Sequence, residues 1–347
     1  MIVTIIGAGM MGSALAFPAR ENGHEVRLVG TPLDADIVKE NKISNKHLKF
    51  DRPFPDGVKH YYFEEMNEAV KGADFIIGGV SSFGVDWFLE EVLKKVDVNI
   101  PVISVTKGLI NLEDGTLISY PDYWNNELKK VGITREICAI GGPCTSYELV
   151  YHDQTEVAFC GTNEKTLKMM KEALATNYYH ISLTSDVIGL ESAVALKNGY
   201  ALAIALTIGL SERKNGLDSG LHFNSQAGAF YQAVREMKLL LKMQGATDDC
   251  ESIGFGDLYV TVYGGRTRKI GILLGRGMTY DDAVNALNGV TLESLVVARR
   301  VAKAVMVKAE KGLVDLNKFP MLMHVSNVLD NGKDAELPWD DFTFTQI

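Results

Sequence analysis

The opening stretch MIVTIIGAGMMG limits what this chain of 347 residues can fold into more than any other segment. A short apolar run over 2–6 leads directly into three glycines spaced as GxGxxG, and a helical pattern follows them. In a strand–turn–helix unit, Gly7 permits the tight turn, Gly9 lets the backbone approach a pyrophosphate, and Gly12 allows the helix to pack closely on the strand. The helix N-terminus then offers unpaired N–H groups to phosphates. The stretch therefore predicts a dinucleotide site.

The remainder of the first half alternates β-type with helical runs, which is typical of a parallel sheet with crossover helices. The expected strands are 2–6, 25–29, 74–80, 101–105, 137–141 and 155–159. The expected helices between them include 11–22, 85–96 and 163–174. After about residue 184 helical spacing continues alone, through 187–211, 225–243, 270–275, 280–287 and 293–311. We expect an α/β domain of the Rossmann type over 1–184, then an all-helical substrate and catalytic domain over 185–347 with a loose aromatic tail after 330.

Charge and cysteine content narrow the classes of partner. The formal net charge of −9 disfavours a general binder of nucleic acids or anionic membranes, since both surfaces repel an acidic protein. The four cysteines form no CxxC pair and no metal-ligand spacing, so we expect free thiols in a reducing cytosol and no metal centre. No basic leader opens the sequence, and Lys197 and Asn198 interrupt the apolar stretch 194–210. We therefore expect a cytoplasmic protein with a buried helix there.

The end of the second expected strand bears on the choice of cofactor. Sites for NAD usually place an acid there, and sites for NADP place a base nearby. Here the segment reads LVGTPLD, so Gly30 and Thr31 take those places and Asp34 comes later. Gly30 has no carboxylate to repel a 2′-phosphate, and the Thr31 hydroxyl could donate to it. Both cofactors remain open, with a slight preference for NADP.

Two further loops follow expected strands, and the carboxyl ends of strands form the ligand crevice of an open α/β sheet. VTKGL places Lys107 after one strand, and GGPCTSYE over 141–148 follows another. A solvated surface lysine is an equal alternative for Lys107 on this motif alone. Cys144 has no base nearby in sequence, so packing or a backbone contact is favoured over a nucleophilic role.

Lys197 interrupts GLESAVALKNGYALAIA, a run that otherwise suits burial. An unpaired buried ammonium is costly, so Lys197 either extends to solvent or faces a cleft. Glu191 and Asn198 are seven apart and project from nearly the same line of a helix, and Lys197 points about 100° away from Asn198. This polar wedge on an apolar helix favours a cleft.

Further along, GDLYVTVYGGRTRKIG carries Asp257 and Thr261, which share one face if the segment is helical. Arg266 follows a pair of glycines in the densest positive segment of an acidic chain. A guanidinium on such a turn suits recognition of a phosphate, with a solvated basic turn as the alternative.

Together these motifs resemble the NAD(P)-dependent glycerol-3-phosphate dehydrogenases of bacteria and archaea. The matching elements, in chain order, are GAGMMGSALA, TKGL, GGPCTSYE, ALKN, GFGDL followed by Thr261, and the arginine turn. They extend from residue 1 to about 330. The resemblance implies a Rossmann domain followed by a helical domain, an active site between them, a small phosphorylated substrate and a homodimer.

The resemblance also implies roles for individual residues. Lys197 would donate and accept the proton, Lys107 would contact substrate and cofactor, and Asp257 would orient the substrate and Lys197. Arg266 would bind the substrate phosphate and approach the cofactor. The other implied substrate contacts are Gly142, Cys144, Asn198, Thr261, Gly265 and Thr267. The implied cofactor contacts are Gly7, Gly9, Met10, Met11, Gly12, Thr31, Lys107, Ser146, Arg266 and Glu293.

Two segments depart from the family pattern. The family's Ser-Arg-Asn turn reads Gly265, Arg266, Thr267 here, and a usual Arg-Gly pair is replaced by Gln232 and Ala233. The expected activity is interconversion of dihydroxyacetone phosphate and sn-glycerol 3-phosphate by hydride transfer with NAD(P)H. The alternatives are a reductase of another small keto or hydroxy compound, such as another phosphorylated ketone or ketopantoate, and a non-catalytic cofactor-sensing protein.

Overall fold

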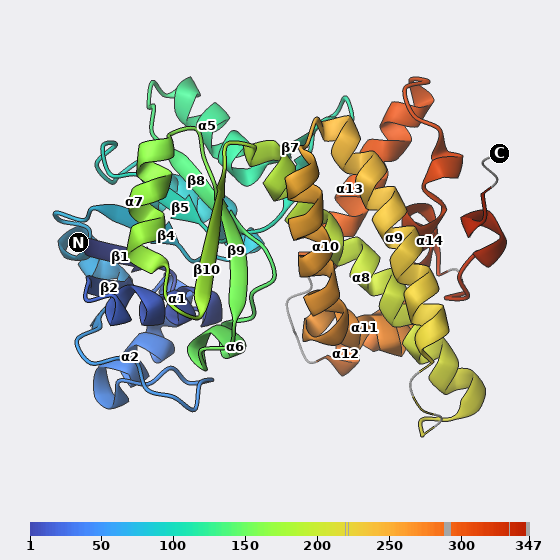
Figure 1. The fold of residues 1–347 in the computed structure, drawn as a ribbon, viewed down its shortest axis with the longest axis horizontal. Helices are drawn as coiled ribbons and strands as arrows, with labels where there is room; N and C mark the ends of the chain where they lie inside the picture. Colours follow the sequence, from blue (N-terminus) through green and yellow to red (C-terminus); the bar gives the residue numbers. More distant parts are fainter. Residues whose placement is uncertain (219, 221, 288–292, 333, 345–347) are drawn as a thin grey trace. The chain divides into compact units, whose positions relative to one another are not determined.

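The computed structural model describes the chain except residues 219, 221, 288–292, 333 and 345–347. The chain divides into two compact units. The N-terminal unit comprises Met1–Lys107 and Ser119–Leu190, and the C-terminal unit comprises Gly108–Ile118 and Glu191–Ile347. Figure 1 shows that strands with covering helices build the first unit and that helices predominate in the second.

An eight-stranded sheet with the order β10-β9-β8-β5-β4-β1-β2-β3 forms the centre of the N-terminal unit. Its strands are β1 (Ile2–Ile6), β2 (Glu25–Val29), β3 (Lys59–Tyr61), β4 (Phe75–Gly78), β5 (Val102–Ser104), β8 (Ile137–Gly141), β9 (Thr155–Cys160) and β10 (Tyr179–Thr184). Neighbouring strands are parallel, except that β8 and β9 are antiparallel. The strand order reverses at β1, which lies between β2 and β4, and a dinucleotide binds at such a switch point.

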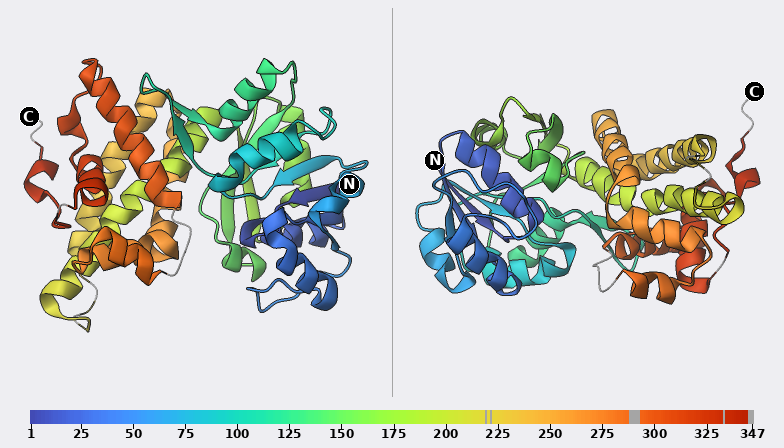
Figure 2. Two further views of the ribbon diagram at one scale, coloured as in Figure 1. Left: turned by 180° about the vertical axis from the view of Figure 1, so that it is seen from behind. Right: turned by 90° about the horizontal axis from the view of Figure 1, so that it is seen from below.

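Helices cover both faces of this sheet (Figures 1 and 2). They are α1 (Met10–Glu21), α2 (Ala35–Ser44), α3 (Met66–Ala69), α4 (Val85–Phe88, continued as a π-helix over Leu89–Leu93), α5 (Tyr120–Lys130), α6 (Ser146–Val150) and α7 (Glu164–Leu174). Because both faces are covered, the central strands are apolar along their length. Val3, Ile5 and Ile6 of β1 are all fully buried.

The C-terminal unit packs its helices around the long α8 (Val187–Asn215), of which the first turn belongs to the N-terminal unit. The other helices are α9 (Phe223–Gln244), α10 (Asp248–Tyr263), α11 (Gly265–Gly275), α12 (Tyr280–Ala286), α13 (Glu293–Glu310) and α14 (Pro320–Asn331). Among the described residues, α8 alone is long and apolar enough to cross a membrane, but 89% of its apolar window is buried inside the structure. It is therefore the core helix of this unit.

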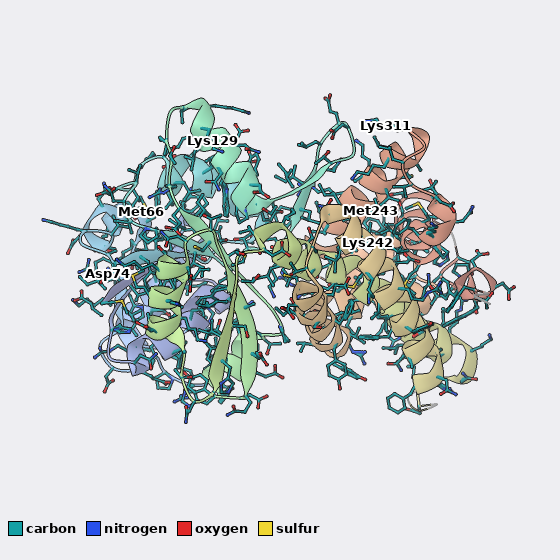
Figure 3. The ribbon with its side chains drawn as sticks, turned by 45° about the horizontal axis from the view of Figure 1, so that its top comes forward. Met66, Asp74, Lys129, Lys242, Met243 and Lys311 are labelled. Carbon is teal, nitrogen blue, oxygen red and sulfur yellow. The ribbon has the colours of Figure 1, made fainter. Side chains whose placement is uncertain are left out.

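A β-hairpin from the middle of the first half joins the helical unit. Strands β6 (Leu109–Asn111) and β7 (Leu117–Ser119) pair with each other, and Arg300 of α13 donates to the carbonyl oxygen of Leu109 at 3.1 Å. Lys311, labelled in Figure 3, donates to the carbonyl oxygen of Asp114 at 2.9 Å. This excursion is not expected from the sequence, where a single boundary near residue 184 is predicted.

The fold class expected from the sequence is confirmed: a mainly parallel sheet with crossover helices precedes a helical region. The six expected strands are present. The additional strands are short, as β3 is, or come late in the first half, as β10 does, and the reversal of β9 relative to β8 depends on tertiary pairing.

The tail is packed as far as Phe344, contrary to the expectation that it is loose. Leu337 and Phe342 are buried in the helical core. Arg235 of α9 donates to the carbonyl oxygen of Phe342 at 2.8 Å, and its guanidinium lies 4.1 Å from the centre of the Phe344 ring. Aromatic side chains on a polar segment thus cover α9 of the same chain.

Candidate active site

The glycine-rich turn after β1 has the geometry that the dinucleotide motif predicts. Gly7 has a φ of +114°, and a Cβ there would lie 2.6 Å from the carbonyl oxygen of Gly79 at the end of β4. A Cβ on Gly12 would lie 2.1 Å from the carbonyl oxygen of Gly7. Gly9 is the N-cap of α1, faces open space, and receives no side-chain cap from the described residues. The first N–H groups of α1, those of Met10, Met11 and Gly12, therefore have no intrahelical acceptor and can bind a pyrophosphate.

At the end of β2 the predicted selector position is sterically closed. A Cβ on Gly30 would lie 2.5 Å from Cγ2 of Val38, so an acid at this position would force the Val38 side chain to shift. Thr31 caps the following 3₁₀ turn, and its hydroxyl donates to Asp34 Oδ2 at 2.8 Å. The donor that the sequence analysis assigns to a 2′-phosphate is thus used within the loop.

Lys107 and Gly142 come together within the N-terminal unit. Lys107 follows β5, Gly142 follows β8, and the Lys107 ammonium donates to the carbonyl oxygen of Gly142 at 3.0 Å. Gly142 is buried, whereas Lys107 is half-buried. The lysine is therefore held at the carboxyl edge of the sheet by the loop that the sequence analysis groups with it, and it is not a freely solvated surface lysine.

Cys144 and Ser146 lie in the same loop. Cys144 is partly buried and packs against the apolar core of the N-terminal unit. Thr145 caps the short α6, accepting from the N–H of Glu148 at 3.4 Å, so Ser146 occupies the first position of that helix. The Cys144 side chain thus makes packing contacts in this loop.

In the C-terminal unit Lys197 of α8 donates to the carboxylate of Asp257 of α10 in a buried ion pair. Lys197 is 9% exposed and Asp257 is 1% exposed. The two helices can approach because Gly254 faces Ala193 one turn before the pair, where a Cβ on Gly254 would lie 2.8 Å from Cβ of Ala193. The charge of Lys197 is therefore matched inside the unit, which explains how an ammonium sits on an apolar helix.

The neighbours of this pair follow from the same helices. Thr261, one turn after Asp257, donates its hydroxyl to the carbonyl oxygen of Asp257 at 2.7 Å. Asn198 adjoins Lys197 and is partly buried. Glu191 at the start of the wedge is fully buried. In the predicted polar wedge, Lys197 therefore pairs with Asp257, and Glu191 lies inside the fold.

The arginine turn joins α10 to α11. Gly265 has a φ of +85°, a conformation that favours glycine. Arg266 is exposed, whereas Thr267 is 6% exposed. Glu293 is partly buried at the start of α13, and residues 288–292 before it lie outside the described residues. The predicted residues thus form two groups, one in each unit.

Two side chains were missed by the sequence analysis. Phe83, 62% exposed, follows β4 at the carboxyl edge of the sheet, where the rule applied to Lys107 would also have selected it.

Glu236 of α9 is fully buried, and its carboxylate accepts from the N–H groups of Met321 and Leu322 at 2.7 and 2.9 Å. Gln232, one of the departures from the family pattern, donates to the same carboxylate at 2.8 Å. Burial raises the pKa of Glu236 to about 7.

Comparison with known proteins gives a consistent family. The model of the NAD-dependent glycerol-3-phosphate dehydrogenase N-terminus matches residues 2–167, and that of the C-terminus matches 186–339. The NADP(+)-dependent glycerol-3-phosphate dehydrogenase of Archaeoglobus fulgidus is 34% identical over 291 residues, covering 83% of this chain and 84% of that protein.

Two solved structures share the fold. The glycerol-3-phosphate dehydrogenase of Coxiella burnetii has a TM-score of 0.79 at 24% identity, covering 96% of this chain and 95% of its own. That of Plasmodium falciparum has a TM-score of 0.82 at 20% identity, covering 100% of this chain and 96% of its own. Fold, motif order and both family models agree with the resemblance found in the sequence. The chain belongs to the NAD-dependent glycerol-3-phosphate dehydrogenase family.

Proposed function

We propose that this chain interconverts dihydroxyacetone phosphate and sn-glycerol 3-phosphate with NAD(P)H. The observation that carries the proposal is the buried Lys197–Asp257 pair, because a fold needs no ammonium on its core helix for stability alone. Membership of the dehydrogenase family supports the same reading, and it does not favour the ketopantoate-type alternative. A protein that only senses the cofactor would have no use for a positioned proton donor.

The chain's own residues supply the proton and the binding of the substrate. When bound, the cofactor supplies the hydride that reaches the ketone carbon. Lys197 donates a proton to the carbonyl oxygen as negative charge develops there, and in the reverse direction its amine accepts the proton from the hydroxyl. Asp257 fixes the orientation of the Lys197 side chain. Lys107, held by the Gly142 carbonyl oxygen, adds positive charge that stabilises the developing alkoxide.

The remaining predicted contacts bind the substrate and the cofactor and shape the substrate site. The exposed guanidinium of Arg266 is suited to the substrate phosphate, since it offers a planar fork of donors. The backbone around Gly142 and Cys144, with Asn198 and Thr261, lines the substrate, and Gly265 and Thr267 flank the arginine. The α1 N-terminus binds the pyrophosphate, with Ser146, Arg266 and Glu293 as further cofactor contacts. Thr31, the other contact expected from the sequence, gives its hydroxyl hydrogen to Asp34 and is left out of this set. The working assembly is a cytoplasmic homodimer.

The cofactor is NADP(H) in preference to NAD(H). Gly30 leaves the selector position without a carboxylate, and the nearby Val38 methyl group disfavours any larger side chain there. The Archaeoglobus fulgidus relative is named for NADP(+). The ratio of kcat/KM for NADPH to that for NADH, measured with dihydroxyacetone phosphate, should exceed one.

The proposal is tested by following nicotinamide absorbance with dihydroxyacetone phosphate, dihydroxyacetone or ketopantoate as substrate. The value of kcat/KM should be much higher for dihydroxyacetone phosphate than for dihydroxyacetone or ketopantoate. Lys197→Met should lower kcat by about 10²- to 10⁴-fold, the usual contribution of a positioned general acid. Lys242→Met, at the exposed lysine labelled in Figure 3, is the matched control and should leave kcat unchanged. Cofactor binding without turnover by the wild-type chain would instead favour the sensing protein.

A further inference from the structure

Asp34 makes an unusual set of contacts for an acid that follows the second strand of a dinucleotide-binding fold. One carboxylate oxygen, Oδ2, accepts from the Thr31 N–H and from the Thr31 hydroxyl, both at 2.8 Å. The same oxygen accepts from the N–H of Ala8, in the glycine-rich turn, at 3.1 Å. Three donors converge on one oxygen, and they join the turn after β1 to the loop after β2.

An acid that selects NAD has a different task. It must offer its carboxylate to the ribose hydroxyls and repel a 2′-phosphate. The usual place for it is the end of the second strand, which here is Gly30, and a Cβ at that position would lie 2.5 Å from Val38. Asp34 lies a full turn later, closes a capping box with Thr31, and uses Oδ2 inside the protein. Its contacts are those of a brace between loops.

The carbonyl side of Ala8 is also enclosed. His47 is 2% exposed, and its ring packs at a tilt of 35° against that of Phe50, with centroids 4.7 Å apart. Its Nδ1 accepts from the N–H of Lys49 at 3.1 Å, so the neutral ring carries its hydrogen on Nε2. Desolvation lowers the pKa of His47, and the nearby Ala8 backbone partly opposes this. The Ser13 hydroxyl donates to the Ala8 carbonyl oxygen at 3.0 Å. Ala8 is therefore held from both sides.

We infer that Asp34 is a positioning residue for the glycine-rich turn and takes no part in choosing between NAD(H) and NADP(H). The inference rests on the proposed dehydrogenase function and adds to it a residue with an assigned task. The brace fixes Ala8, which lies between Gly7 and Gly9, and so fixes the direction in which the first N–H groups of α1 point. Loss of the Asp34 contacts should lower the affinity for both cofactors by the same factor, because both contain the pyrophosphate that this turn binds.

The two roles of Asp34 predict different ratios of dissociation constants. The test titrates NADPH and NADH, by nicotinamide fluorescence and without substrate, into wild type, Asp34→Ala, Asp34→Asn and the control Asp36→Asn. Asp36 is an exposed acid in the first turn of α2, the helix that Asp34 precedes. Asp34→Ala should raise both dissociation constants by roughly tenfold, the effect of about one lost net hydrogen bond at the turn. Asp34→Asn keeps an acceptor oxygen, so it should restore most of the affinity, again equally for both cofactors. Asp36→Asn should change neither.

Several outcomes overturn the inference. If Asp34→Asn or Asp34→Ala binds NADPH more tightly while binding NADH more weakly, Asp34 selects the cofactor through its charge. If Asp34→Ala changes neither affinity, the brace has no effect on binding. Asp34→Asn decides between the roles even if Asp34→Ala does not fold, since only a selector changes the ratio when charge alone is removed. Failure of wild type to bind either cofactor would instead refute the proposed function.

Discussion

Separating the Lys197–Asp257 pair should cost the C-terminal unit a large part of its stability. Both side chains are almost fully buried, at 11% and 2% side-chain exposure, so solvent does little to screen either charge once its partner is gone. Removing one member of a buried pair typically costs about 3–5 kcal/mol, because the remaining charge is left uncompensated. We therefore expect Asp257→Leu and Lys197→Met each to lower the free energy of unfolding by about this amount.

The double variant Lys197→Met/Asp257→Leu makes the prediction quantitative. Replacing a buried pair by apolar residues of similar volume is often close to neutral, so the double variant should be more stable than either single one. The assay is urea denaturation followed by far-UV circular dichroism, with the four proteins forming a double-mutant cycle. The coupling free energy should be several kcal/mol, which is roughly the sum of the two single losses minus the small loss of the double variant.

A control pair lies in the same unit. Lys238 and Glu251 form an ion pair at 3.2 Å, but Lys238 is 56% exposed, so Lys238→Met should cost less than about 1 kcal/mol. If the losses from Lys197→Met and Asp257→Leu simply add, or match that of Lys238→Met, then the two charges do not depend on each other. That result would also contradict the assignment of Asp257 as the group that orients Lys197.

Two further predictions concern the substrate and the pH dependence of stability. Arg266→Ala should mainly raise KM for dihydroxyacetone phosphate and leave the activity on dihydroxyacetone unchanged; an equal effect on both substrates, or the same effect from Lys269→Ala nearby, would contradict a phosphate contact. For Glu236 the pKa rises on folding from 4.5 to about 7, so the native state holds an extra proton between these values and the unfolding free energy should fall as pH rises through them. The fall is worth about 3 kcal/mol. Urea denaturation at a series of pH values should show this slope in wild type and not in Glu236→Gln, and an equal slope in both would exclude Glu236 as its source.

The cofactor-binding part of the site could be predicted from the sequence because its geometry depends on residues that are close together in the chain. A strand, three glycines and a helix within twelve residues leave one geometry for the turn. The capping box of Thr31 and Asp34 was also readable, since Thr-x-x-Asp before a helix is a known start signal. What no local pattern could give is the third donor to Asp34, the N–H of Ala8, because it comes from the turn after β1, which is distant in sequence from Asp34.

The catalytic half depends on contacts between helices far apart in the chain. The resemblance named Lys197 and Asp257 separately, but their pairing requires α8 and α10 to touch, and this is set by small residues, Ala193 and Gly254, one turn away. Glu236 could have been noticed, since it stands among Ala229, Ala233, Met237 and Leu240 on the apolar stripe of α9. Its partners, the N–H groups of α14, could not, because they depend on how that helix docks.

Backbone conformation and burial explain the residues on either side of Arg266. A serine at position 265 would have to adopt a φ of +85°, a conformation that costs an L-residue about 1 kcal/mol or more, so the glycine there follows from the backbone. Thr267 is buried in α11, where its side chain packs inside the unit and does not extend to solvent. Recognition of a phosphate at this turn must therefore rest on the exposed guanidinium of Arg266 and not on its neighbours. For this reason Arg266→Ala is the substitution that most directly separates a phosphorylated ketone from its uncharged analogue.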